Sequence, residues 1–321
     1  MLRRPIVDRM ATIASSAVGD ALRFGSQHMT APPRTAVGFV AAIIHRAVAD
    51  IAAGWAPLCA SQGLWLEIDG VFCHAAPIVG YADTAGQQRR CELADLLIAV
   101  DTVSSGAWVR RAALIQAKMA ARSARVVMSG PSTRNQLELY QQWPVFDFEE
   151  AAYGLKQVNF RKGNNTADSG TFGVIDRHLI EPATDPPIWT QHSAWPTPHD
   201  TSHGVTLGVF LAEIVDGRRG VGRECTPSLR TDWCKTVQCL LEITFRRSFR
   251  HRPTLGNRAM QRGVHAPASL ALRTAQGPVG QFWIGSGAPP SFRGEEVSRE
   301  PDRPLGINAL YIKLQDTDAA G

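Results

Sequence analysis

Three polar residues in the middle of the chain have types and a spacing that suit a metal ion beside a phosphate group. Asp95 begins the apolar run Leu96–Val100, and Gln116 and Lys118 interrupt a second apolar run over residues 112–120. Alternate residues of a strand point to the same face of its sheet, so Gln116 and Lys118 are expected to lie side by side. Carboxylate and amide oxygens suit Mg²⁺ or Mn²⁺, and an ammonium group neutralises phosphate charge. The pattern predicts metal-dependent cleavage of phosphodiester bonds.

Two further residues extend this candidate site. Glu92 precedes Asp95 by three positions, where its carboxylate would add a metal ligand or hold Lys118 in place. His74 lies on a strand-like segment ahead of the acidic pair and would carry a proton or contact the substrate. A histidine on an apolar strand is more often a hydrogen-bonded structural residue. Likewise, an Asp and a Lys at these places can simply mark strand edges, but polar groups inside an apolar strand cost stability unless they find partners.

A family resemblance follows from the same residues. The segment ELADLLIAV followed by ALIQAK resembles the PD-(D/E)xK endonuclease superfamily, in the Mrr-like variant where Gln replaces the second acid. The resemblance covers residues 65–119, and the flanking blocks FCHAAPIV and QLELYQQWPVF are similar to those of bacterial proteins associated with phage defence. It implies a central mixed sheet, Mg²⁺ or Mn²⁺ as cofactor, and cleavage of DNA or RNA, with DNA favoured. Asp95 matches the metal-binding Asp, Gln116 the second ligand and Lys118 the lysine.

The sequence departs from that family in two ways. Many members place a Glu on the first helix, whereas residues 35–58 contain none. Glutamine is also a weaker metal ligand than a carboxylate. Both departures leave open a second hypothesis, in which a catalytically inactive nuclease fold binds nucleic acid or a partner protein.

Arginine supplies nearly all of the positive charge, and its planar guanidinium group binds phosphate through two hydrogen bonds. A GC-rich coding genome would enrich arginine without any function. The candidate nucleic-acid contacts are Arg110, Arg111, Arg246, Arg247 and Arg250. The first two begin a predicted strand. The last three crowd the end of a predicted helix, where they either complement the helix dipole or follow a phosphate backbone.

The elements that position these residues are expected to form a mixed α/β fold, with a restriction-endonuclease-like sheet flanked by helices. The nuclease-like core is predicted to span residues 35–180. It contains a helix over residues 35–58, whose apolar residues recur every three to four positions. A hairpin is expected over residues 63–79 with its turn at Asp69 and Gly70, and two strands flank a turn at residues 104–106.

The two ends of the chain are assigned by composition. Residues 1–34 are expected to form a loosely ordered leader that ends in the breaker cluster Ala31–Arg34. Residues 181–321 are expected to form a C-terminal α/β extension, which either stands apart or packs into one domain with the core.

Bulk composition narrows the class of protein. The chain has 321 residues, 44% of them hydrophobic and 20% charged, and a net charge of +5, which is mild for a nucleic-acid-binding protein. It lacks the glycine-rich phosphate loop, the G-x-S-x-G elbow and the dinucleotide fingerprint. Scattered cysteines and the lack of a continuous membrane span favour a cytoplasmic protein without membrane contact. A homodimer is expected, because two active sites cut both strands of a duplex most easily. A partner protein from a defence system is a further expectation.

Overall fold

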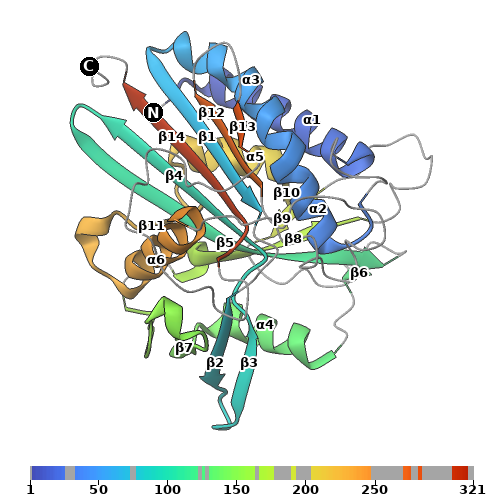
Figure 1. The fold of residues 1–321 in the computed structure, drawn as a ribbon, viewed down its shortest axis with the longest axis vertical. Helices are drawn as coiled ribbons and strands as arrows, with labels where there is room; N and C mark the ends of the chain where they lie inside the picture. Colours follow the sequence, from blue (N-terminus) through green and yellow to red (C-terminus); the bar gives the residue numbers. More distant parts are fainter. Residues whose placement is uncertain are drawn as a thin grey trace.

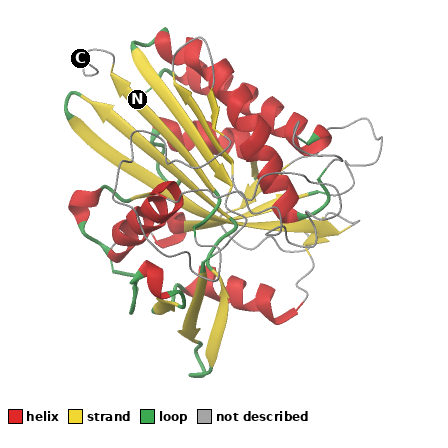
Figure 2. Cartoon of the chain, viewed as in Figure 1, coloured by secondary structure: helices red, strands yellow, loops and turns green. Residues whose placement is uncertain are grey.

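A curled, mixed β-sheet flanked by helices organises the chain (Figure 1). Helices cover both faces of this sheet, so the fold is mixed α/β (Figure 2). The computed structural model describes residues 2–25, 33–72, 77–121, 125–126, 130–162, 166–176, 189–192, 204–246, 270–275, 281–283 and 306–316.

The main sheet is built from segments that lie far apart in the sequence. Its strand order is β10 (Val205–Thr206), β9 (Trp189–His192), β8 (Gly170–Ile175), β5 (Ala107–Ala121), β4 (Leu96–Ser104), β14 (Ala309–Asp316), β1 (Leu64–Phe72), β12 (Leu270–Ala275) and β13 (Gln281–Trp283). Two short strands, β6 (Arg125–Val126) and β11 (Arg223–Glu224), also pair with β5. Strand β14 is parallel to β4, and β8 is parallel to β5, whereas the other pairs are antiparallel. A second, three-stranded sheet contains β3 (Gln88–Glu92), β2 (Ile78–Ala82) and β7 (Phe146–Phe148).

The helices separate into two layers, one on each face of the main sheet. The first layer contains α1 (Arg4–Phe24), α2 (Ala36–Ala42), the π-helical turn η1 (Ile43–Ala47), α3 (Val48–Ala60) and α5 (Leu207–Asp216). The second layer contains α4 (Gly130–Gln142) and α6 (Asp232–Arg246). In the part of the chain that the structure describes, short 3₁₀ turns are η2 (Ala151–Tyr153), η3 (Thr166–Ser169) and η6 (Pro227–Leu229).

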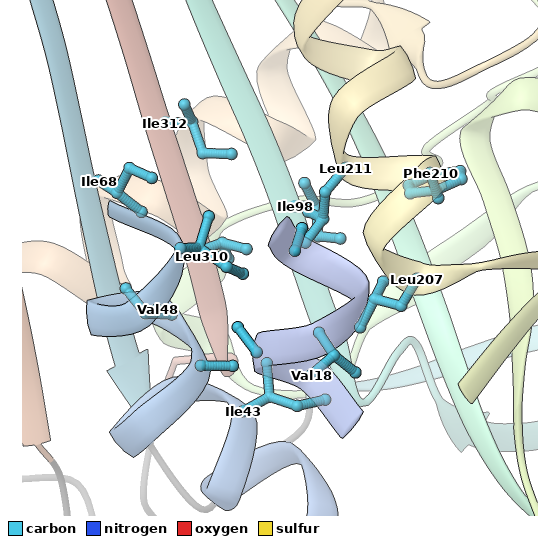
Figure 3. Packing of buried hydrophobic residues seen from close by; sticks show 14 of the residues in the cluster. Val18, Ile43, Val48, Ile68, Ile98, Leu207, Phe210, Leu211, Leu310 and Ile312 are labelled. Atoms are coloured by element: carbon cyan, nitrogen blue, oxygen red, sulfur yellow. The ribbon is translucent and has the colours of Figure 1, made fainter. Parts of the chain in front are cut away.

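Strand β4 shows how one apolar run serves both layers. Leu96 and Ile98 belong to the core under α1, α3 and α5, whereas Leu97 and Ala99 belong to the core under α4 and α6. A strand buried on both faces reads as a continuous apolar run, which is the pattern that this segment has. Figure 3 shows the core under α1, α3 and α5, where Ile98 of β4 lies beside Leu211 of α5.

Several sequence predictions agree with this architecture. The predicted helix over residues 35–58 corresponds to α2, η1 and α3, and the predicted strands correspond to β4 and β5, joined at the expected turn. The predicted hairpin over residues 63–79 is wrong, because Asp69 and Gly70 lie inside β1. A Cβ atom at Gly70 would lie 3.1 Å from Ile44 Cγ2 and 3.2 Å from Val48 Cγ2. The glycine therefore allows a helix to approach the strand closely and does not make a turn.

The predicted leader is also wrong for most of its length. Residues 4–24 form α1, whose residues Met10 and Leu22 are fully buried. The Trp55 indole donates a hydrogen bond to the Met10 carbonyl oxygen at 2.9 Å, which ties α1 to α3. At the other end of the chain, part of the predicted C-terminal extension lies inside the sheet, since β14 sits between β1 and β4 (Figure 1).

One helical stretch, Ala36–Ala60, is long and apolar enough to cross a membrane by its length and composition. In the structure this stretch packs against β1 and α1, and residues such as Phe39, Ile43 and Trp55 are fully buried. Burial against the sheet accounts for the apolar character of the helix.

Candidate active site

The structure brings Asp95, Gln116 and Lys118 to one face of the sheet. Leu97 and Leu114 face the core under α4 and α6, and side chains alternate along each strand. The same alternation directs Asp95, just before β4, and the two polar residues of β5 toward α4. The Asp95 amide donates to the Ile115 carbonyl oxygen at 2.9 Å, so the pairing of the two strands extends to this position.

Asp95 is held from both sides. Its Oδ2 accepts a hydrogen bond from the Ala117 amide at 2.8 Å, and its carbonyl oxygen accepts one from Asn308 Nδ2 at 2.8 Å. Burial raises the pKa of the half-buried Asp95 carboxyl to about 6; the nearby Glu92 carboxylate also raises it, while Lys118 and the Ala117 amide lower it. A carboxyl group whose pKa is shifted by burial and by charged neighbours, here Lys118 and Glu92, is the kind of group found at functional sites.

Gln116 is fully buried, and its side-chain amide is only half satisfied. Its Nε2 donates to the Glu92 carbonyl oxygen at 2.9 Å. A flipped amide would bring Oε1 next to the Glu92 carbonyl oxygen, and two acceptors cannot form a hydrogen bond. The contact therefore assigns Nε2 to the side of Glu92 and Oε1 to the other side. Among the described residues, no partner reaches Gln116 Oε1. A buried acceptor without a partner costs about 1–3 kcal/mol of stability. A cation or a water molecule that bound this oxygen would offset that cost.

Lys118 is half-buried and is held by helix α4. Its Nζ donates to Gln136 Oε1, and Gln136 is itself almost fully buried. Within the described ranges, Lys118 makes no ion pair, although its charge lowers the pKa of Asp95. Because Gln136 is an uncharged amide, this contact adds no negative charge beside the lysine.

Helix α4 supplies a wall of the site that the sequence analysis missed. Tyr140 lies one helical turn after Gln136, and its hydroxyl donates to the Leu93 carbonyl oxygen at 2.9 Å. The Tyr140 ring lies 4.8 Å from the Trp143 ring and 5.2 Å from the Phe172 ring, centroid to centroid. The spacing of four residues between Gln136 and Tyr140 was the one available signal, because on a helix it places both side chains on one face.

The two secondary candidates have different outcomes. Glu92 ends β3 and is half-buried; its carbonyl oxygen fixes Gln116, and its carboxylate acts on the pKa of Asp95. The predicted role of His74 falls on a residue that lies outside the described part of the chain. Asn308, the residue before β14, also contacts the site. It lies more than two hundred positions from Asp95 in the sequence, so no local sequence pattern could have predicted this contact.

The arginine predictions need a correction. Arg110 is 5% exposed, and its Nε and Nη2 donate to the two carboxylate oxygens of Asp101 at 2.6 and 2.7 Å. Gln238 and Tyr311 complete this buried cluster, so Arg110 is a structural residue and not a nucleic-acid contact. Arg111 points to the opposite face of the sheet and donates to the Gly222 carbonyl oxygen at 3.3 Å.

The remaining predicted contacts are at the end of α6. Arg247 and Arg250, together with the side chain of Arg246, fall outside the described residues.

The oxygen donors of the site suit a hard divalent cation. Asp95 offers a carboxylate and Gln116 an unpartnered amide oxygen, and both types of oxygen bind Mg²⁺ or Mn²⁺. The donor set is small, because the described residues contain no group of three or more His, Cys, Asp or Glu side chains that could hold a metal ion. Water and a bound phosphate would have to supply the other ligands.

Comparisons of the chain with protein-family models, with curated proteins and with solved structures give no match. The residues of the site and their geometry are therefore the basis for a functional proposal.

Proposed function

We propose that this protein is a metal-dependent nuclease with a restriction-endonuclease-like core, which hydrolyses phosphodiester bonds of nucleic acid, with DNA favoured. One observation carries the proposal. The acid just before β4 and the amide and lysine of β5 lie on one face of the sheet, and the amide oxygen of Gln116 is buried without a partner among the described residues. A purely structural site would be expected to satisfy that oxygen.

The side chains have separate roles in this proposal. Asp95 and Gln116 Oε1 would hold Mg²⁺ or Mn²⁺. A bound divalent cation activates a water molecule and stabilises charge on the phosphate oxygens. Lys118 would add positive charge where negative charge develops, and Gln136 fixes its ammonium group in place. Asp95 must be ionised to bind the cation, so its raised pKa links activity to pH.

A non-catalytic protein that binds nucleic acid or a partner protein is the second candidate. The observation that favours it is the small donor set, since no trio of His, Cys, Asp or Glu ligands is found in the described ranges.

Plasmid and single-stranded substrates incubated with Mg²⁺, Mn²⁺ or EDTA separate the two candidates. Catalysis predicts metal-dependent cutting that Asp95→Asn and Lys118→Met abolish. Asp50→Asn on the exposed face of α3 and Lys235→Met on α6 are matched controls and should cut normally, because both side chains are more than half exposed. Binding without cutting under every metal condition would favour the second candidate.

A homodimer and a role in phage defence, with a partner protein of the defence system, complete the proposal. The dimer follows from the mechanism, since two sites are needed to cut both strands of a duplex in one encounter. Light scattering on the purified protein tests the dimer. Plating of phage on cells that carry either the wild-type protein or the Lys118→Met variant tests the role in defence.

A further inference from the structure

Two buried hydrogen-bond donors lie on the face of the main sheet that α5 covers, opposite the face of the candidate active site. Trp189 and Gln191 of β9 are 1% and 4% exposed. Trp189 belongs to the core under α1, α3 and α5, and Gln191 shares its face because side chains alternate along a strand. The indole nitrogen of Trp189 and Nε2 of Gln191 have no hydrogen-bond partner among the described residues.

Strand β8 brings the two donors to the same part of this face. Gly173 of β8 is directly across from Gln191, and a Cβ atom at Gly173 would lie 2.3 Å from the Trp189 indole nitrogen. The indole therefore lies over the backbone of Gly173, where only a glycine leaves room for it. Thr171, two positions earlier on β8, donates a hydrogen bond to Gln191 Oε1 at 3.0 Å. The amide oxygen of Gln191 is thus satisfied, and its amide nitrogen is not.

The surroundings of these donors decide which kind of acceptor they suit. A buried indole N–H usually has a hydrogen-bond partner, as those of Trp55 and Trp233 do in this structure. Ala117 and Ile175, which lie on the same face beside the donors, belong to the apolar core. A fully charged acceptor would be costly in these surroundings, whereas an uncharged oxygen atom would satisfy the donors without that cost.

We propose that Trp189 and Gln191 form a binding site for an uncharged hydrogen-bond acceptor, the oxygen atom of a water molecule or of a small carbonyl compound. The oxygen accepts from the Trp189 indole N–H and from Gln191 Nε2. A buried water molecule typically makes about three hydrogen bonds to polar groups that the protein leaves unsatisfied. This acceptor site is independent of the proposed nuclease function, because it lies on the other face of the sheet.

Replacement of a tryptophan by benzothienylalanine, which has sulfur in place of the indole N–H and nearly the same shape, tests whether the donor has a partner. At Trp189 the loss of a hydrogen bond to a bound acceptor should lower the folding equilibrium constant about tenfold in urea unfolding. Trp55 is the matched control, because its N–H donates to the Met10 carbonyl oxygen at 2.9 Å and its replacement should have a similar effect. Unchanged or higher stability after replacement of Trp189 would contradict the proposal.

Two further measurements identify the acceptor. A magnetisation-transfer signal between water and the Trp189 indole proton would indicate a bound water molecule. That signal should persist in Thr171→Val, which removes the nearby hydroxyl whose exchange with water could relay it. An excess mass in the native mass spectrum that disappears on denaturation would indicate a small carbonyl compound. If the wild-type protein gives neither signal, the proposal is overturned, even where a variant does not fold.

Discussion

Lys118 of β5 donates a hydrogen bond to Gln136 of α4, so a helix holds the lysine of the candidate site from a position eighteen residues further along the chain. The contact makes Gln136 a positioning residue. Because Gln136 is almost fully buried, its side chain has little freedom to release the ammonium group.

Gln136→Ala should therefore lower nuclease activity while metal binding is retained. Without its acceptor, Lys118 samples several rotamers, and we expect the turnover rate to fall about 10–100-fold with a much smaller change in KM. Gln141→Ala, at an exposed position of the same helix, is the matched control. Steady-state kinetics together with a Mn²⁺ titration measure both properties; an equal loss of metal affinity would instead indicate that the site had collapsed.

The pKa of Asp95 predicts opposite effects of pH on activity and on stability. Burial raises the pKa of the Asp95 carboxyl to about 6 in the folded protein, from about 4 in the unfolded chain. Metal-dependent cleavage should therefore rise as pH increases through about 6. In the same range the folded state binds more protons than the unfolded state, so the contribution of Asp95 to stability falls as pH rises from about 4 to 6.

Asp95→Asn tests the stability half of that prediction. The amide oxygen can still accept the hydrogen bond from the Ala117 amide, and the cost of burying a charge is removed. We expect the variant to be more stable than the wild type at pH 7 by about 1–2 kcal/mol, a value reduced because the group is partly exposed, and to be inactive. Urea unfolding at pH 4, 5, 6 and 7 measures the effect, and a variant that is less stable at every pH would contradict it.

Arg110 provides a prediction on stability and not on binding. Arg110→Met leaves the Asp101 carboxylate buried without its positively charged partner, which should cost about 3–5 kcal/mol. The double variant Arg110→Met/Asp101→Leu removes both charges and should recover part of that loss. Arg111→Met, on the other face of the sheet, should change stability far less. Thermal and urea unfolding compare the three, and a specific loss of nucleic-acid binding in folded Arg110→Met would contradict the structural role.

The local part of the site could be predicted from the sequence, because it depends on alternation within two neighbouring strands. Asp95 precedes one apolar run, and Gln116 and Lys118 interrupt another. A period of two places all three on one face wherever those runs form adjacent strands. Gln136, Tyr140 and Asn308 could not be assigned in this way. They reach the site through the docking of α4 and the insertion of β14, and no local pattern encodes either event.

The errors in the fold have a similar cause. Asp69 and Gly70 have the composition of a tight turn, but close contact with Ile44 and Val48 requires a glycine inside a straight strand. The π-helical turn η1 was likewise not predicted; it contains the buried His45, whose ring meets the Phe72 ring edge to face at 5.5 Å. Tertiary packing determines both local structures and overrides the secondary-structure propensity of the residues.

Helix α1 is part of the core, and Gly208 of α5 packs directly against it. A Cβ atom at Gly208 would lie 2.2 Å from the Ser15 backbone nitrogen, so an added methyl group would force the two helices apart. We expect Gly208→Ala to destabilise the protein by about 1–3 kcal/mol. Gly80→Ala is the control, because the nearest atom to its Cβ, the Arg89 carbonyl oxygen, lies at an ordinary contact distance of 3.7 Å.

Urea unfolding of the two glycine variants, alongside a chain that lacks residues 1–25, tests whether α1 is structural. A core helix predicts that Gly208→Ala lowers stability, that Gly80→Ala changes it little, and that the truncated chain fails to fold cooperatively. A truncated chain that unfolds with the midpoint and slope of the full chain would show that residues 4–24 behave as a detachable leader. The burial of Met10 and Leu22, and the hydrogen bond from Trp55 to Met10, argue for the first result.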